Sequence, residues 1–194
     1  MCGMFYIEAD DMTIEVVKVL ESINREKLNK HASRDVKPTD YAPVITVQGV
    51  SAMQWGFTLP DRKIPIINAR SETAAQKPLF APSLQQRRCL LPASGYYEWD
   101  RSKNKYTIGR GSPIFMAGIY RPEDDRVTRF CILTQSPTVS LSHIHDRMPV
   151  ILHEEAAEKW LMGSLQPNNL HQYIPQGIVG HTHAAQISMF DGLT

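Results

Sequence analysis

Residues 88–99 read RCLLPASGYYEW, and this segment gives the clearest indication of how the chain folds. Its apolar and aromatic residues are interrupted by Pro92 and Gly95, a pattern typical of strands in an antiparallel sheet. Runs of the same kind lie on both sides of it: APVITVQG (42–49), MQWGFTLP (53–60), IPIINAR (64–70), KYTIGRG (105–111), SPIFMAGIY (112–120) and TRFCILTQ (128–135). We therefore expect a protein made mainly of antiparallel strands.

Two segments have the period of an amphipathic helix instead. In residues 10–30, capped at Asp11 or Thr13, apolar residues recur as one stripe that we expect to be buried: Ile14, Val17, Leu20, Ile23 and Leu28. Residues 153–163, HEEAAEKWLMG, begin with acidic residues and end at a glycine. From residue 165 we expect a short helix or loop, then a last strand near 181–188. The sequence thus predicts one α+β domain over residues 1–194, with a β-rich core and flanking helices.

The bulk composition is that of an ordinary globular protein. The chain has 194 residues, 42% hydrophobic and 21% charged, and these fractions exclude a disordered or fibrous chain. Its formal net charge of +1 neither requires nor excludes a nucleic-acid partner. The three cysteines, Cys2, Cys89 and Cys131, are an odd number without C-x-x-C spacing, which indicates free thiols in a reducing cytosol. With no membrane span or secretory signal in the sequence, we expect a soluble cytoplasmic protein.

The N-terminal sequence MCG places a cysteine directly behind the initiator methionine. Removal of Met1 would leave Cys2 with a free α-amine beside its thiol, and each of these groups can attack a carbonyl carbon. Together they can close a five-membered ring on an aldehyde. The alternative is that Cys2 is an ordinary residue at a loose chain end.

Two further segments carry functional groups that a plain core would not contain. NARSET, residues 68–73, concentrates Asn68, Arg70 and Glu72 behind an apolar run, and is either part of a site or a solvated strand end with a helix cap. In SGYYEW, Glu98 stands between Tyr97 and Trp99. A desolvated carboxyl group suits a general acid or base, but alternation along a strand would also allow an exposed Glu98 on an outer face.

Histidines occur in two H-x-H pairs, one at 143 and 145 and one at 181 and 183. In an extended chain both members of a pair point the same way, so four imidazoles would make a zinc site conceivable. No cysteine or carboxylate stands at a conventional ligand interval beside them, and a single histidine acting near neutral pH is the commoner use. We expect no metal and no other cofactor.

Taken in order, MCG, YAP, WGF, INARSET, RCLLPASGYYEW, PIFMAGIY and IHDRMPVIL resemble the SOS-response-associated peptidase (SRAP) family, from residue 2 to about residue 160. The resemblance implies a DNA-binding cleft and an enzyme of the DNA damage response that bonds covalently to abasic sites in single-stranded DNA. The implied product is a thiazolidine DNA-protein crosslink through Cys2, which shields the lesion. The family name also implies a peptidase activity that removes Met1. The resemblance implies an abasic-site lyase activity as well.

The resemblance assigns roles to particular residues. Cys2 would be the nucleophile, Asn68 would hold the N-terminal amine or the sugar, and Glu98 would be the general acid and base. His145 would donate a hydrogen bond to the sugar. The residues implied in DNA binding are Arg70 and Thr134 on phosphates and Trp99 and Pro43 against bases. The implied partner is single-stranded DNA with abasic sites, bound by a monomer that would be nucleoid-associated when on DNA.

Three departures from the family pattern stand near the implied site. Position 4 is Met where relatives commonly have Arg, and Asp40 stands where relatives have Asn. The segment TLPDRKIP, residues 58–65, lacks the tryptophans found in many relatives. These changes weaken the case for DNA affinity more than the case for the covalent chemistry.

Three other functions remain open at this stage. An N-terminal Cys-Gly also begins the glutamine amidotransferases, N-terminal-nucleophile amidohydrolases in which the thiol attacks an amide. The two H-x-H pairs would suit a metal-dependent hydrolase, and a non-catalytic DNA-binding module would not need Cys2. Cys89, Cys131, Trp55 and Trp160 are expected in the core. Arg147 is either a phosphate contact or part of a structural ion pair.

Overall fold

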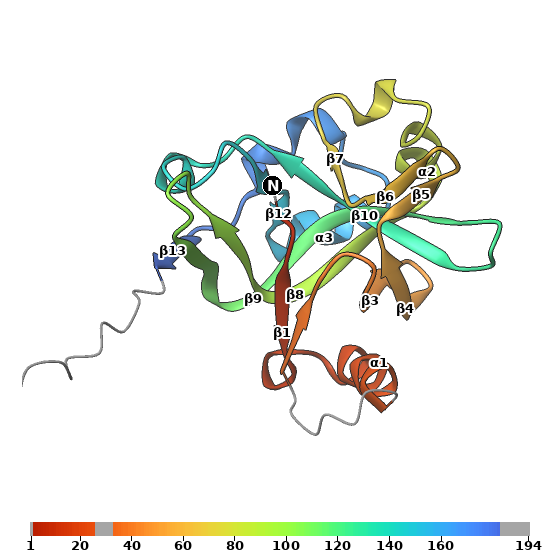
Figure 1. Ribbon diagram of the computed structural model, residues 1–194, viewed down its shortest axis with the longest axis horizontal. Coiled ribbons are helices and arrows are strands. Elements are labelled where there is room, and N and C mark those ends of the chain that lie inside the picture. Colours follow the sequence, from red (N-terminus) through yellow and green to blue (C-terminus); the bar gives the residue numbers. More distant parts are fainter. Residues whose placement is uncertain (1, 26–32, 183–194) are drawn as a thin grey trace, which may run out of the picture.

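The computed structural model describes residues 2–25 and 33–182 (Figure 1). Its centre is an antiparallel meander of three long strands: β8 (Arg88–Trp99), β9 (Lys105–Pro122) and β10 (Thr128–Gln135). The bounds of β8 and β10 are those expected from the sequence. The two runs expected at 105–111 and 112–120 form the single strand β9, which continues through Gly111 in a left-handed conformation (φ +69°).

Two more strands close the meander into a small barrel. The hairpin of β3 (Tyr41–Thr46) and β4 (Gly49–Trp55) pairs with β8 on one side and with β10 on the other. The ring of neighbours is β8, β9, β10, β4 and β3, and the β4–β10 pairing is parallel. The core is therefore mostly antiparallel, as expected, but the sheet as a whole is mixed.

The remaining strands extend the barrel sheet or stand beside it. They are β1 (Phe5–Glu8), β2 (Ser33–Val36), β7 (Asn68–Arg70), β11 (Met148–Pro149), β12 (Ile151–Leu152), β13 (Val179–Thr182), and a separate hairpin of β5 (Phe57–Leu59) and β6 (Arg62–Ile66). Strand β1 lies antiparallel to β8, and β7 lies parallel to β10. These two pairings bring the N-terminal segment and the NARSET segment to the barrel.

Large apolar side chains fill the barrel. The Trp55 ring stacks on Phe130 with centroids 6.1 Å apart and packs against Phe5 at 5.3 Å. Gly118 on β9 lies in a tight part of the wall, because a Cβ there would stand 2.5 Å from Leu91 Cδ2. Cys2 belongs to this same buried cluster. The N-terminal cysteine is thus packed against the barrel core and is not a loose chain end.

Helices cover the outside of the barrel. They are α1 (Ile14–Arg25), α2 (Ala81–Gln86) and α3 (Glu154–Leu161), with the 3-10 turns η1 (Ala9–Asp11), η2 (Ala74–Gln76), η3 (Val139–Leu141) and η4 (Pro167–Tyr173). A second core lies under α2 and α3, where Trp160 and Cys131 are fully buried. In Figure 1, β1 runs downward from the N-terminus, and α1 lies beyond its C-terminal end, at the bottom of the molecule.

The expected helices are confirmed in position, but the stripe on the first is partly wrong. Val16 and Leu20 are buried in α1, whereas Ile14, in its first turn, is 64% exposed. Leu28 lies outside the described residues. Helix α3 begins after His153, whose Nδ1 accepts a hydrogen bond from the Ala156 N–H at 3.4 Å.

The C-terminal strand begins earlier than expected. Strand β13 starts at Val179 and pairs with β9, and the part of the expected strand from 183 to 188 lies outside the described residues. The fully buried side chains of Cys89, Cys131, Trp55 and Trp160 confirm the core assignments. Within residues 2–25 and 33–182, no helix is long and apolar enough to span a membrane.

Candidate functional site

Cys2 lies at the end of β8 because β1 carries the N-terminal segment there. Phe5 pairs with Tyr96, and the carbonyl of Met4 accepts the Tyr97 N–H at 2.9 Å. Continued in this antiparallel register, the chain brings Cys2 to the level of the last residues of β8. Its side chain is fully buried there, and Sγ lies 4.0 Å from the Met4 carbonyl oxygen.

Asn68 is in direct contact with this N-terminal segment. Its Nδ2 donates a hydrogen bond to the carbonyl oxygen of Cys2 at 2.8 Å. The other end of the amide, Oδ1, is buried and has no hydrogen-bond partner in the structure. A buried amide oxygen without a donor is costly, so this geometry indicates a site prepared for a further N–H or O–H group.

Glu98 lies on the inner side of β8 and is only 5% exposed. Its Oε1 accepts the Trp99 N–H at 3.3 Å. Of the two readings that the sequence left open, the exposed Glu98 on an outer face is therefore wrong. The flanking aromatics do not desolvate the carboxyl group either, because Tyr97 and Trp99 point to the opposite face of the strand. Burial at the barrel end desolvates it.

The thiol of Cys2 is strongly perturbed by this environment. Burial, and next to it the negative charge of Glu98, raise the pKa of the Cys2 thiol to about 12, against a small opposing effect of the hydrogen bond to Met4. The thiol is therefore protonated at neutral pH in this form of the protein. A reaction at Cys2 needs a group that accepts the thiol proton, and Glu98 is the carboxylate close enough to influence it.

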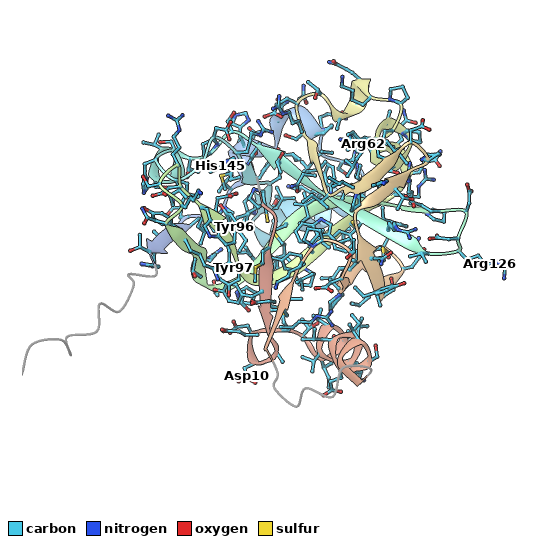
Figure 2. The ribbon with its side chains drawn as sticks, viewed as in Figure 1. Asp10, Arg62, Tyr96, Tyr97, Arg126 and His145 are labelled. Carbon is cyan, nitrogen blue, oxygen red and sulfur yellow. The ribbon has the colours of Figure 1, made fainter. Side chains whose placement is uncertain are left out.

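Tyr96 is a further member of this cluster that the sequence reasoning missed. It is 1% exposed, and its pKa is raised well above the usual value by burial and by the charges of Cys2 and Glu98. The signal was present in the sequence. Residues two apart on a strand share a face, so Tyr96 had to accompany Glu98. Figure 2 shows Tyr96 and His145 on the part of the molecule away from Arg126, at the tip of the β9–β10 hairpin.

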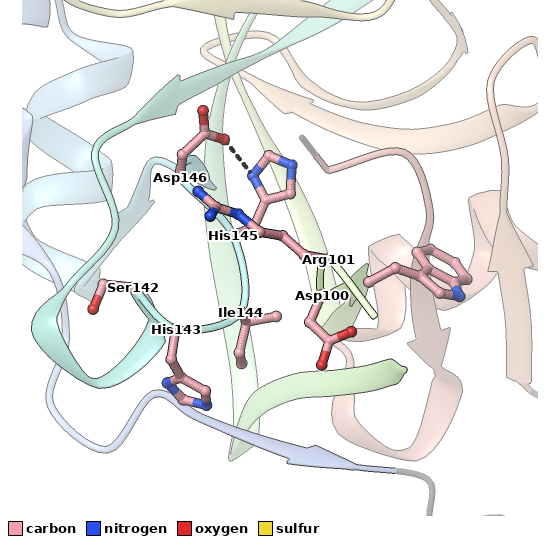
Figure 3. A pocket seen from close by; sticks show the side chains of 8 residues that line it. Asp100, Arg101, Ser142, His143, Ile144, His145 and Asp146 are labelled. Atoms are coloured by element: carbon pink, nitrogen blue, oxygen red, sulfur yellow. Dashed lines mark ion pairs between the residues drawn. The ribbon is translucent and has the colours of Figure 1, made fainter. Parts of the chain in front are cut away.

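His145 lines a pocket of about 590 Å³ beside this cluster (Figure 3). One wall is the turn after β8, with Trp99, Asp100 and Arg101, and the other is the loop after η3: Ser142, His143, Ile144, His145 and Asp146. Trp99 directly follows Glu98 in the chain, so the last residues of β8 contribute both to this pocket and, on the other face of the strand, to the cluster around Cys2. Of the three tryptophans, Trp99 is the exposed one, at 39%, whereas the other two are fully buried.

The ring of His145 is approached by two groups on the same nitrogen. Nδ1 lies 2.8 Å from Asp146 Oδ1 and 3.0 Å from the backbone N–H of Arg147. The carboxylate requires a proton on Nδ1, whereas the N–H requires a lone pair there. The two contacts therefore require different placements of the proton on the ring.

Arg147 forms an ion pair, one of the two readings that the sequence left open. Its guanidinium binds both carboxylate oxygens of Glu72 at 2.8 Å and donates to the carbonyl of Thr134 at 2.7 Å. This pairing lowers the pKa of Glu72, chiefly through the Arg147 hydrogen bond. The ion pair connects the segment that follows β7 to the loop that carries His145. Strand β7 itself begins with Asn68.

The residues expected to bind DNA are placed unequally. Arg70 is exposed and shares a face of β7 with Asn68, and Trp99 opens into the pocket. Thr134 is fully buried beside Arg147, so it has no surface for a phosphate in this structure. Pro43 is also buried, on the face of β3 opposite to the barrel-lining Ala42.

The negative charge of Asp40 is partly compensated. Its Oδ2 accepts the Lys37 N–H at 3.0 Å and its Oδ1 lies 3.8 Å from the guanidinium of Arg34. Asp40 thus stabilises the turn before β3. Its charge is less of an obstacle to a nearby phosphate than the sequence alone suggested.

The two H-x-H pairs do not form a metal site in the described part of the chain. No group of three or more candidate ligands occurs in residues 2–25 and 33–182, and His183 lies outside them. His143 packs edge-on against Tyr106, with ring centroids 6.0 Å apart. His181 lies opposite Thr107 in the β9–β13 pairing.

Comparison with known proteins gives a consistent result. The model of the SOS response associated peptidase (SRAP) family matches residues 1–188. The Bacillus subtilis abasic site processing protein YoqW is 34% identical over 186 residues, which cover 83% of this chain and 80% of that protein. YoaM of the same organism is 36% identical (83% and 79% covered), and Escherichia coli YedK is 36% identical over a shorter stretch (60% and 56%).

Solved structures show the same fold. A crystal structure of a Bacteroides thetaiotaomicron protein superimposes with a TM-score of 0.73 at 25% identity, covering 93% of this chain and 91% of that one. A phage-related protein from Bordetella bronchiseptica superimposes with a TM-score of 0.69 at 22% identity, covering 93% of each chain. The overall fold is therefore shared with experimentally determined structures.

Proposed function

The chain belongs to the SOS response associated peptidase family, and from this premise we propose that it processes abasic sites in single-stranded DNA through a covalent bond to Cys2. The relatives named above are called abasic site processing proteins. The observation that carries the proposal is the contact between Asn68 and Cys2, at 2.8 Å, next to the buried carboxyl group of Glu98. These three groups come from three separate segments of the sequence.

The proposed reaction begins with the removal of Met1, which frees the α-amine of Cys2. The amine attacks the aldehyde carbon of the ring-opened abasic deoxyribose, a C–N bond forms, and the aldehyde oxygen leaves as water. The thiol sulfur then adds to the same carbon, and its proton ends on the nitrogen. The product is a thiazolidine, and one water is released for each crosslink.

The state of the thiol favours this order of steps. With a pKa of about 12, the buried thiol is a poor nucleophile at neutral pH, whereas an α-amine with an ordinary pKa near 8 is partly neutral. An imine carbon is more electrophilic than the aldehyde from which it formed. The thiol therefore adds second, with Glu98 moving its proton.

Asn68 would position the new N-terminus. Its Nδ2 already holds the carbonyl of Cys2, and its partnerless Oδ1 is the acceptor that a freed α-amine or a sugar hydroxyl requires. Fixing the amine at the aldehyde makes the attack effectively intramolecular, an effect that can be worth several powers of ten in rate. Asn68 acts by geometry and does not itself exchange a proton.

Opening of the sugar requires a base and an acid. Glu98 would take the proton of the hydroxyl on C1′ as the C1′–O4′ bond breaks, and His145 would supply the proton that O4′ takes up.

Arg70 and Trp99 would hold the DNA strand, Arg70 through a phosphate and Trp99 through a base. Contacts from Thr134 and Pro43 would require these buried residues to become exposed on binding. Removal of Met1 by the protein itself, and strand cleavage as a lyase, belong to the same proposal.

A denaturing gel tests the proposal. Protein lacking Met1 is mixed with a single-stranded oligonucleotide that carries one abasic site, and the matched control is the same oligonucleotide with an intact base. We expect a heat-stable shifted band with the abasic strand only, and none with Cys2→Ala. A band that persists in Cys2→Ala would contradict the assignment of the nucleophile, and steady ammonia release from glutamine would favour an amidotransferase instead.

A further inference from the structure

Two aromatic rings hold the side chain of Lys105, the first residue of β9. Lys105 pairs with Trp99 at the end of β8. Its Nζ lies 3.7 Å from the centroid of the Tyr97 ring and 5.9 Å from that of the Trp99 ring, both within the range of a cation–π contact. No carboxylate within residues 2–25 and 33–182 forms an ion pair with Lys105. The rings therefore fix the ammonium group without neutralising its charge.

The Tyr97 ring is itself held from two sides. Its hydroxyl donates a hydrogen bond to Asp35 Oδ1 on β2 at 3.1 Å, and its ring packs on Tyr6 of β1 with centroids 5.2 Å apart. Gly95 makes room for Tyr6, because a Cβ there would stand 2.7 Å from the Tyr6 hydroxyl oxygen. Burial, and next to it the charge of Asp35, raise the pKa of Tyr97 to about 12, so the phenol is neutral at physiological pH. The ammonium of Lys105 thus rests on an uncharged ring that is fixed in place.

Trp99 connects this lysine to the pocket described above, because it lines the pocket and also lies beside Lys105. A base stacked on Trp99 places the sugar and phosphate of the same nucleotide at the edge of the ring. We propose that Lys105 binds a phosphate of the nucleotide whose base stacks on Trp99, and that Tyr97 is a positioning residue for the ammonium. This inference rests on the proposed function. Lysine binds phosphate as a point charge, so its position matters more than its orientation.

The charged groups near Lys105 are compatible with a phosphate at this point. Asp100, in the turn after β8, accepts hydrogen bonds from the backbone and side-chain amides of Asn104, each at 2.9 Å. Arg101, in the same turn, is exposed and adds positive charge. Glu8 is farther away, because its N–H donates to the Ser94 hydroxyl, at the level of β8 residues well before Trp99. The positive charge of this surface is therefore concentrated beside the pocket.

The experiment compares wild-type protein with Lys105→Gln, Tyr97→Leu and Tyr97→Phe. The matched control is Lys18→Gln, which removes the same charge from the exposed side of α1, at the bottom of the molecule (Figure 1). Fluorescence anisotropy over a salt series measures binding to an intact single-stranded oligonucleotide. The rate of crosslinking to an abasic oligonucleotide is measured as a function of DNA concentration. Tyr97→Phe keeps the ring and removes only the hydroxyl, so it separates the aromatic contact from the bond to Asp35.

We expect Lys105→Gln to bind several-fold more weakly at low salt and to reduce the slope of log K against log salt by about 0.7, the value for one phosphate on a single strand. It should raise the DNA concentration needed for half-maximal crosslinking and leave the rate at saturating DNA unchanged. Tyr97→Leu should also weaken binding, whereas Tyr97→Phe and Lys18→Gln should match wild type.

Two results would count against the inference while leaving the crosslink at Cys2 intact. A wild-type salt slope in Lys105→Gln would overturn the phosphate contact. Equal binding by Tyr97→Leu and Tyr97→Phe would overturn the positioning role of the ring. If the wild-type protein neither binds nor crosslinks DNA, the proposed function and this inference fail together.

Discussion

At the scale of single residues, the site depends on the state of Cys2. The side chain is buried in the barrel core with its thiol protonated, and Asn68 holds the adjacent carbonyl. A buried, protonated thiol resists oxidation and metal binding, because the thiolate is the reactive form. In the proposed reaction, this arrangement would keep the thiol unreactive until the amine has formed an imine beside it.

Removal of the Asn68 amide should affect the rate far more than the stability. We expect Asn68→Ala to reduce the crosslinking rate by about 100-fold, because the freed amine loses its positioning partner. The variant loses the unsatisfied Oδ1 together with the one hydrogen bond from Nδ2 to the Cys2 carbonyl, so the expected cost in folding free energy is about 1 kcal/mol. The measurement is a single-turnover crosslinking time course, with Asn169→Ala in the exposed part of η4 as the control. An unchanged rate in Asn68→Ala would remove Asn68 from the site.

Arg70 should contribute affinity and not chemistry. Arg70→Gln is expected to weaken binding to intact single-stranded DNA and to reduce the slope of log K against log salt by about 0.7, the value for one phosphate contact on a single strand. Arg126→Gln, at the tip of the β9–β10 hairpin, is the matched control (Figure 2). Fluorescence anisotropy over a salt series measures both. Equal slopes for the two variants would mean that Arg70 does not face the strand.

The sequence predicted part of this residue set on physical grounds. Alternation along residues 88–99 was enough to separate Glu98 from Tyr97 and Trp99, but not to say which face was buried. Which face of β8 is buried depends on β1, which packs against β8 although the two strands lie about 90 residues apart in the sequence. The burial of Thr134 likewise depends on a contact from Arg147, on a loop that no local pattern connects to β10.

At the scale of elements, a charged cluster fastens the β5–β6 hairpin to the end of the β9–β10 hairpin. Glu123 accepts hydrogen bonds from Arg121 at 2.7 and 2.9 Å, from Arg129 at 2.9 Å, and from the Thr58 N–H at 3.0 Å. Burial alone would raise the pKa of Glu123, but the hydrogen bonds from Thr58 and Arg121 outweigh it and lower the pKa. One carboxylate thus links β5 to two other strands.

Glu123→Gln should therefore destabilise the protein by about 2–4 kcal/mol, because two arginines lose a partly buried counter-charge. Since the pKa of Glu123 is lowered on folding, its contribution is present above its ordinary pKa near 4.5 and is lost as the pH falls below that value. Urea denaturation at pH 7 and pH 4 measures both effects. We expect the difference between wild type and variant to shrink at pH 4, and a constant difference would contradict the role of the charge.

Element boundaries followed from the sequence where one local pattern dominates. Strands β8 and β10 are uniform apolar runs, and both were located correctly. The break expected within β9 was wrong, because Gly109, Gly111 and Pro113 are accommodated inside a continuous strand. Helix α2 was missed although Pro82 stands in its first turn, a position where proline favours a helix start. Its six residues are too few to show a helical period.

At the scale of the whole molecule, the two cores bury more thiols than the proposed reaction uses. Cys2, Cys89 and Cys131 are all fully buried, and burial raises the pKa of each, to about 12 for Cys2 and Cys131. In the unfolded chain these thiols ionise near pH 9. Above that pH the unfolded state releases protons that the folded state retains, so folding stability falls.

We therefore expect the free energy of unfolding to be steady up to about pH 8.5 and to fall above pH 9, by up to about 1.4 kcal/mol per pH unit for each thiol. Cys131→Ala should be less stable than wild type at pH 8, because it leaves a small cavity, but should lose stability less steeply above pH 9. Urea denaturation at pH 8 and pH 10 compares the two slopes. Parallel slopes would show that this thiol does not ionise on unfolding.

The overall architecture could be predicted only in part from the sequence. Composition and strand patterns gave an α+β domain with a β-rich core, and the ordered motifs gave the family. The closure of the barrel could not be predicted, because it depends on the parallel pairing of β10 with β4, and neither could the parallel pairing of β7 with β10. Those pairings join segments more than 60 residues apart, and they place Asn68 beside Cys2.

The intact mass of the crosslinked product tests the central claim most directly. Protein and abasic oligonucleotide are incubated together, and the complex is weighed without reduction. The proposal predicts the mass of the protein lacking Met1 plus that of the oligonucleotide minus one water, with no such species from protein that retains Met1. A covalent complex formed with Met1 still present, or one without the loss of water, would contradict a thiazolidine at Cys2.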